Sequence, residues 1–139
     1  MTVTLCDAGP LLAIIDPHQG SDHVRCAQQI KELRGILVTT WPCVTEAMHL
    51  ADKVGGQSMQ RGLWRLLSSN CVEIELLTKE DGHRMDALMH RYSNVPMDWA
   101  DASLCVTAEK RSVRRIFTLD SDFRIYRLVD GGFFEIIPA

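Results

Sequence analysis

Short apolar segments typical of β-strands alternate with helical segments along the chain. The strand-like segments are residues 3–6, 36–38, 72–75, 115–118 and 134–137. Helices are expected at residues 11–15, 22–33, 39–55, 58–67, 78–92 and 98–110. Strands that alternate with helices form parallel sheets, because each helix carries the chain back to the edge where the next strand starts. The sequence therefore predicts an α/β fold with three layers, α/β/α, around a central, mainly parallel sheet of four to five strands.

The length and composition fit one compact domain, residues 1–139. A chain of 139 residues with 46% hydrophobic and 24% charged residues is long enough to bury a core. Its cysteines are scattered without a C-x-x-C pair and are expected to be buried free thiols, which suits a reducing cytosol. They are Cys6, Cys26, Cys43, Cys71 and Cys105. No signal peptide or membrane-spanning segment is recognised, so a cytoplasmic location is expected.

Two carboxylates, Asp98 and Asp101, stand three residues apart at the start of the helix expected at 98–110. Side chains at this spacing share one face of a helix, and two like charges there repel unless a cation lies between them. A hard divalent ion such as Mg²⁺ is the usual solution. The alternative is that Asp98 caps the helix and Asp101 stabilises its positive end without a metal. The pair alone leaves both interpretations open.

Other acids follow different elements at the same expected edge of the sheet. Asp7 lies just past the first strand, Asp120 just past the strand at 115–118, and Glu46 early in the helix after the second strand. Ligands of open parallel sheets bind beyond the carboxyl ends of the strands. Each acid also has a local explanation as a cap or turn residue. Gathered together, however, they would repel one another without a counter-ion, so we expect one acidic metal site.

Several enzyme classes are disfavoured by missing motifs. The chain has no Gly-rich phosphate loop followed by Lys, no G-x-S-x-G elbow and no cysteine or histidine pair spaced for zinc. A phosphatase of the haloacid type would carry Asp-x-Asp after the first strand, where residue 9 is Gly, and the Lys of a receiver domain is not found. The net charge of −3 gives no overall basic field for nucleic acid.

Four motifs, in order, resemble the PIN domain, and most closely the VapC-type toxins of bacterial toxin–antitoxin pairs. They are Asp7-Ala-Gly-Pro-Leu-Leu, Thr45-Glu46-Ala47, Pro96-Met-Asp-Trp-Ala-Asp-Ala-Ser103 and Thr118-Leu-Asp-Ser-Asp-Phe123. The resemblance runs from the first strand to the end of the chain.

The resemblance implies an endoribonuclease that depends on Mg²⁺ or Mn²⁺ and cuts single-stranded or loop RNA. In the family's order of acids, Asp7, Glu46, Asp101 and Asp120 match the first to the fourth, and Asp98 matches an extra acid found in part of the family. It also implies a homodimer and a small cognate antitoxin that inserts into the acidic groove. The alternative is an inactive PIN-like module that binds RNA or protein.

Within this site we assign Asp7, Asp101 and Asp120 as metal ligands, with Glu46 and Asp98 acting through water. Residues expected to support them or to contact substrate are Thr118, Asp122 and Arg115. Asp122 is also a second candidate for the fourth acid, although Asp120 is preferred.

Cations and aromatic side chains near the site are candidates for RNA contact. Trp41 and Trp99 are of a type that stacks on bases, but core packing is predicted for both. The arginines considered for phosphate contact are Arg61, Arg65, Arg111, Arg114 and Arg115.

Overall fold

A five-stranded parallel sheet lies at the centre of the computed structural model, which describes residues 2–139. The strands are β1 (Val3–Cys6), β2 (Ile36–Thr40), β3 (Val72–Glu75), β4 (Arg115–Phe117) and β5 (Glu135–Ile137). Their order is β3-β2-β1-β4-β5, and each neighbouring pair is parallel. The predicted α/β class and parallel sheet are confirmed.

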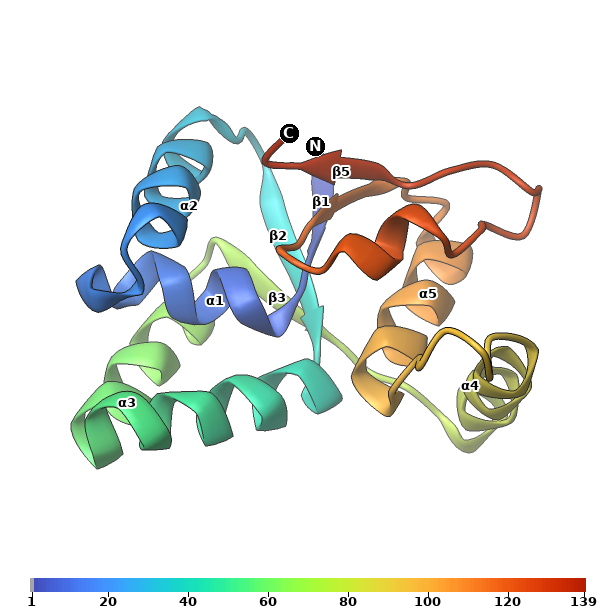
Figure 1. Ribbon diagram of the computed structural model, residues 1–139, viewed down its shortest axis with the longest axis horizontal. Coiled ribbons are helices and arrows are strands. Elements are labelled where there is room, and N and C mark those ends of the chain that lie inside the picture. The colour runs from blue at the N-terminus through green and yellow to red at the C-terminus, as the bar shows by residue number, and fades with distance from the viewer. Residues whose placement is uncertain (1) are drawn as a thin grey trace.

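Helices cover both faces of the sheet, as Figure 1 shows. They are α1 (Ala8–Ile15), α2 (Ser21–Glu32), α3 (Trp41–Leu67), α4 (Lys79–Arg91) and α5 (Trp99–Arg111), with 3₁₀ turns at Pro17–Gln19 and Ser121–Arg124. The first three helices lie on one face, and α4 and α5 lie on the other. The layers are therefore α/β/α.

Two hydrophobic cores result from the alternation of side chains along each strand. Leu5 and Ile116 pack into the core beneath α4 and α5, whereas their neighbours Cys6 and Phe117 pack into the core beneath α1, α2 and α3. All four side chains are fully buried. Both faces of β1 and β4 are thus apolar, as is usual for central strands of a parallel sheet.

The connections change direction between β1 and β4. From β1 the chain moves outward to β2 and β3, and it then returns to form β4 and β5 on the other side of β1. Such a reversal opens a crevice at the carboxyl ends of the two strands, where α/β folds bind ligands. Asp7 follows β1 at this point, and its main-chain N–H donates to Phe117 O at 2.9 Å.

The structure differs from the sequence predictions in local details. The helices expected at 39–55 and 58–67 join into α3 across a kink at Gly56, whose φ of 63° and ψ of −154° suit only glycine. Helix α2 has Gly20 at its N-cap and no side-chain cap. Thr78 and Asp81 form a capping box at the start of α4.

Some predictions of burial were wrong. Four cysteines are buried free thiols, but Cys71 is exposed. Trp41 and Trp99, predicted to pack in the core, are exposed as well. Trp41 is the first residue of α3, and Trp99 is the first residue of α5. Over residues 2–139, no helix has the length and apolarity needed to cross a lipid bilayer.

Candidate functional site

Three aspartates from separate parts of the chain meet at the crevice between β1 and β4. Carboxylate oxygens of Asp7, Asp101 and Asp120 all lie within 4.8 Å of one another. Asp7 follows β1, Asp101 is in the first turn of α5, and Asp120 follows β4. The structure therefore brings together the three side chains that were assigned as metal ligands; their role remains a prediction.

Thr118 connects two of these acids. Its hydroxyl donates to Asp7 Oδ2 at 2.8 Å and accepts from the main-chain N–H of Asp120 at 3.0 Å. Asp7 Oδ1 accepts from the N–H of Ala8 at 2.8 Å, because Asp7 is the N-cap of α1. These three hydrogen bonds fix the direction of the Asp7 carboxylate.

Asp98 and Asp101 form a reciprocal capping box at the start of α5. Asp98 Oδ1 accepts from the N–H of Asp101 at 2.8 Å, and Asp101 Oδ2 accepts from the N–H of Asp98 at 3.2 Å. The capping interpretation of Asp98 is therefore right, and it also orients Asp101 toward the cluster. Among residues 2–139, no group donates to Asp101 Oδ1, so this oxygen is available to a ligand.

Tyr126 supports Asp101 from the side of the core. The Tyr126 hydroxyl donates to Asp101 Oδ2 at 3.4 Å, and the ring is fully buried against Tyr92 and Phe123. No motif of the sequence marks this residue. It lies outside the four motifs, and its contact with Asp101 arises only when the segment after β4 folds back over α5.

Asp120 holds the remaining position of the cluster. Its Oδ1 accepts from the N–H of Asp122 at 2.9 Å and caps the 3₁₀ turn Ser121–Arg124. Asp122 thus takes part through its main chain, and its carboxylate is not one of the three that converge. Of the two candidates for this position, the geometry favours Asp120.

Burial and mutual repulsion raise the pKa values of these carboxyl groups. The pKa of Asp101 is raised to about 8 by burial and by the charges of Asp98, Asp7 and Asp120. Burial is also the main cause that raises the pKa of Asp7, and Asp120 and Asp98 add to it. The groups oppose simultaneous ionisation, so a cation that neutralises them is strongly favoured.

Glu46 extends this cluster from α3. Burial and the charges of Asp7, Asp98 and Asp120 raise the pKa of Glu46 to about 7. A carboxyl group that titrates near neutral pH is able to take up and release a proton under physiological conditions. Its oxygen does not belong to the tight group of three.

The set of donors fits a hard divalent cation. It consists of oxygens only, which Mg²⁺ and Mn²⁺ prefer, whereas zinc sites use histidine or cysteine. Asp101 Oδ1 and Asp120 Oδ2 accept no hydrogen bond from the described residues and remain open to such an ion.

A buried pair of hydroxyl groups joins the helices that carry the acids. Thr40 Oγ1 and Ser103 Oγ lie 2.6 Å apart, and the Ser103 hydroxyl is 2.6 Å from Ala100 O. Thr40 is the N-cap of α3, so this contact positions the helix of Glu46 against the helix of Asp101. Ser103 stood within a recognised motif, but nothing in the sequence singled out Thr40.

The arginines expected to contact phosphate lie elsewhere. Arg115 begins β4, at the edge of the sheet opposite the acids, and pairs with Glu135 at 3.3 Å. The prediction that Arg115 lies near the site is wrong, because β4 begins at Arg115 and runs from there toward the acids. Arg111 pairs with Glu73 and Glu75, at 3.3 and 3.1 Å.

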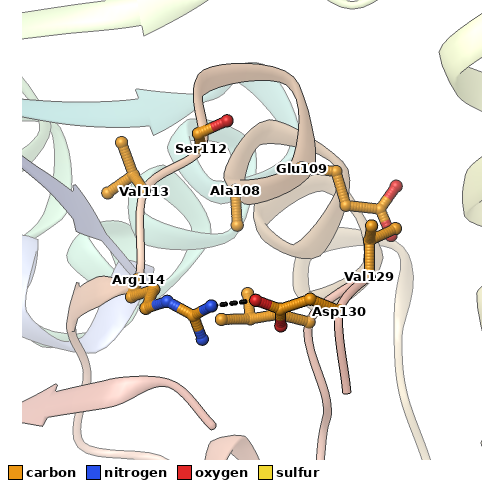
Figure 2. A pocket seen from close by; sticks show the side chains of 8 residues that line it. Ala108, Glu109, Ser112, Val113, Arg114, Val129 and Asp130 are labelled. Carbon is orange, nitrogen blue, oxygen red and sulfur yellow. Dashed lines mark hydrogen bonds and ion pairs between the residues drawn. The ribbon is translucent and has the colours of Figure 1, made fainter. Parts of the chain in front are cut away.

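Arg114 borders a separate cavity at the far end of α5. Figure 2 shows its guanidinium group directed toward Asp130, with which it forms an ion pair, and Ala108 and Val113 also line this cavity. The cavity has a volume of about 310 Å³. Because the acids lie at the N-terminal end of α5 and this cavity at its C-terminal end, the two are distinct.

Two other arginines lie beside the acidic cluster and were missed. Arg25 and Arg124 line a hollow of about 250 Å³ together with Thr118 and Asp120. Arg124 forms no ion pair with any residue in 2–139, and Arg25 has only a long contact of 3.9 Å with Asp22. These side chains are better placed for phosphate contact than those predicted.

The fold is that of a PIN domain. No family model matches the chain. Ribonuclease VapC26 of Mycobacterium tuberculosis (strain ATCC 25618 / H37Rv) is 28% identical over an alignment of 143 positions. The alignment covers 96% of this chain and 99% of that protein.

Two solved structures share the architecture. VapC20 of Mycobacterium tuberculosis is described as a sarcin-ricin loop cleaving toxin. Its structure matches with a TM-score of 0.83 at 15% identity, and the match covers 93% of this chain and 98% of the VapC20 chain. A toxin–antitoxin complex from Klebsiella pneumoniae contains a chain that matches with a TM-score of 0.65 at 19% identity. This match covers 86% of the present chain and 89% of the matched chain. The predicted PIN-like fold and the predicted resemblance to VapC-type toxins are thereby confirmed.

Proposed function

We propose that this protein is an endoribonuclease that hydrolyses RNA with the help of Mg²⁺ or Mn²⁺. The observation that carries the proposal is the convergence of Asp7, Asp101 and Asp120 oxygens within 4.8 Å at the crevice of the sheet. The raised pKa values of Asp7 and Asp101 add support, because they mark a cluster that a cation would stabilise. The relation to Ribonuclease VapC26 supports RNA as the substrate.

Each acid has a distinct task in this proposal. Asp7, Asp101 and Asp120 hold the cation, which when bound lowers the pKa of water and stabilises charge on the leaving oxygen. Glu46, which lies beside the three aspartates, accepts a proton from the attacking water. Asp98 keeps Asp101 in place through the capping box.

Thr118 is a positioning residue in this proposal. Replacing it with Val removes the hydrogen bonds to Asp7 Oδ2 and from the Asp120 N–H while nearly preserving the side-chain shape. We expect Mn²⁺ affinity to fall about 10- to 100-fold, as for other residues that orient metal ligands. The Mn²⁺ affinity is measured by recording the cleavage rate at increasing Mn²⁺ concentrations. Thr118→Ser should restore Mn²⁺ binding. Equal affinity in Thr118→Val and the wild type would contradict the assigned role.

Removal of divalent ions tests the proposed activity directly. The purified protein should cleave single-stranded RNA in Mn²⁺ or Mg²⁺, lose this activity in excess EDTA and recover it when the metal is restored. Cleavage that persists in EDTA would exclude the metal-dependent mechanism. An RNA-binding protein that never cleaves would instead fit the alternative of an inactive PIN-like module.

The proposal includes a cognate antitoxin, a homodimer and a cytoplasmic location. The similarity in fold to a chain of a toxin–antitoxin complex supports the antitoxin. A gene for a short DNA-binding protein beside the gene for this chain is the expected sign of such a partner.

A further inference from the structure

We infer that the cleft between Trp41 and Trp99 binds one unpaired base of the RNA, beside the phosphodiester bond that is cut. The inference rests on the proposed ribonuclease function and names a contact that selects the substrate.

The cleft is an apolar hollow of about 210 Å³ at the starts of α3 and α5. Its lining comes from four segments and consists of Trp41, Pro42, Glu75, Leu77, Thr78, Gly82, Met85 and Trp99. Sites that enclose a whole small-molecule ligand usually have about 300–1,000 Å³, so this hollow suits a single ring system.

Both indole rings are available to a ligand. Each tryptophan is 47% exposed, although tryptophan is highly buried on average in proteins. Within residues 2–139, neither ring pairs with another aromatic ring or a cation, and neither indole N–H donates to the protein. Bases stack on exposed aromatic side chains of this kind, largely without regard to sequence.

The cleft lies at the starts of the two helices that carry Glu46 and Asp101. Trp99 is the residue between Asp98 and Ala100 and lies two positions before Asp101. Trp41 follows Thr40, whose hydroxyl contacts Ser103 on α5. Because both rings stand at the starts of these helices, a base that neighbours a phosphate at the three aspartates has them within the span of about one nucleotide. This position favours a base of the substrate as the occupant of the cleft.

Gly82 keeps the hollow open. A Cβ atom built at this position on α4 would lie 4.0 Å from Trp99 Cη2, so a short side chain fits and a longer one extends toward the ring. Leucine has a better helix propensity than glycine. Gly82→Leu is therefore expected to fold and to fill the cleft without removing either tryptophan.

Binding of a single-stranded RNA of mixed sequence, measured in EDTA so that nothing is cut, tests the inference. We expect the wild-type indole fluorescence to be quenched and the RNA affinity of Trp41→Ala, Trp99→Ala and Gly82→Leu to fall roughly 5- to 150-fold. Trp64→Ala is the matched control, because Trp64 is also 47% exposed but lies in the second half of α3, outside this cleft. Its affinity should equal that of the wild type.

A second substrate separates base stacking from other effects. An RNA with an abasic nucleotide next to the cleaved bond should bind the wild type more weakly than intact RNA, but it should show no further loss with Trp41→Ala or Trp99→Ala. Unchanged RNA affinity in all three cleft variants overturns the inference, and Mn²⁺-dependent cleavage by the same variants would show that the ribonuclease proposal survives.

The remaining outcomes also decide the question. If the cleft variants bind RNA normally but no longer self-associate or bind a protein partner, the cleft is a protein interface and the inference is wrong. If the wild type cleaves no RNA yet its affinity depends on Trp41 and Trp99, the base contact stands and the proposed catalytic function falls.

Discussion

Replacing Asp101 with Asn is expected to abolish RNA cleavage while the protein remains folded. The Asn side chain keeps one oxygen that accepts from the Asp98 N–H and from the Tyr126 hydroxyl, so the cap of α5 and its contact with the core survive. What is lost is the negative charge beside Asp7 and Asp120. Losing about 4 kcal/mol of charge stabilisation in the transition state corresponds to a roughly 1,000-fold lower kcat.

The measurement is the single-turnover cleavage rate in saturating Mn²⁺, together with a thermal melt. Asp86→Asn serves as the control, because Asp86 is an exposed acid on α4 that makes the same change in charge away from the cluster. Asp7→Asn should behave like Asp101→Asn. Cleavage at the wild-type rate in both variants, Asp7→Asn and Asp101→Asn, would refute the ribonuclease proposal.

Without divalent ions, the free energy of unfolding should decrease as the pH rises from about 4 to about 8. A carboxyl group with a higher pKa in the folded state keeps its proton longer there, so the folded state loses stability between the two pKa values. The pKa of Asp101 is raised from 3.8 to about 8, and that of Glu46 from 4.5 to about 7. Asp16 and Asp81 have lowered pKa values and lose their stabilising effect only at more acid pH.

Mn²⁺ should reverse this trend, because it binds the ionised carboxylates and not the protonated ones. Its stabilising effect should therefore grow as the pH rises, reaching about 2.7 kcal/mol where the free ion is at 100 times its dissociation constant. Urea unfolding at several pH values, in EDTA and in Mn²⁺, measures both effects. Asp101→Asn should flatten the pH dependence in EDTA, and a wild-type protein that grows more stable toward pH 8 in EDTA would contradict the raised pKa values.

The sequence alone determined the layers of the fold and the acids that converge. Apolar runs at strand spacing alternate with helical runs, and this local periodicity fixes a parallel sheet because each strand needs a helix to return the chain. Asp7 and Asp120 directly follow strands, and Asp101 begins a helix that leads into one, so their place at one edge of the sheet follows from topology. Such features depend on neighbours within a few residues and are visible in the order of the chain.

The tertiary structure decided which side chains surround those acids. Tyr126 contacts Asp101, and Thr40 contacts Ser103, across 25 and 63 positions of the chain, through packing that no local pattern encodes. The exposure of Trp41 and Trp99 likewise depends on how far α4 approaches the starts of α3 and α5. Hydrogen bonding and burial of this kind are set by surfaces that meet only after folding, and so the order of residues does not reveal them.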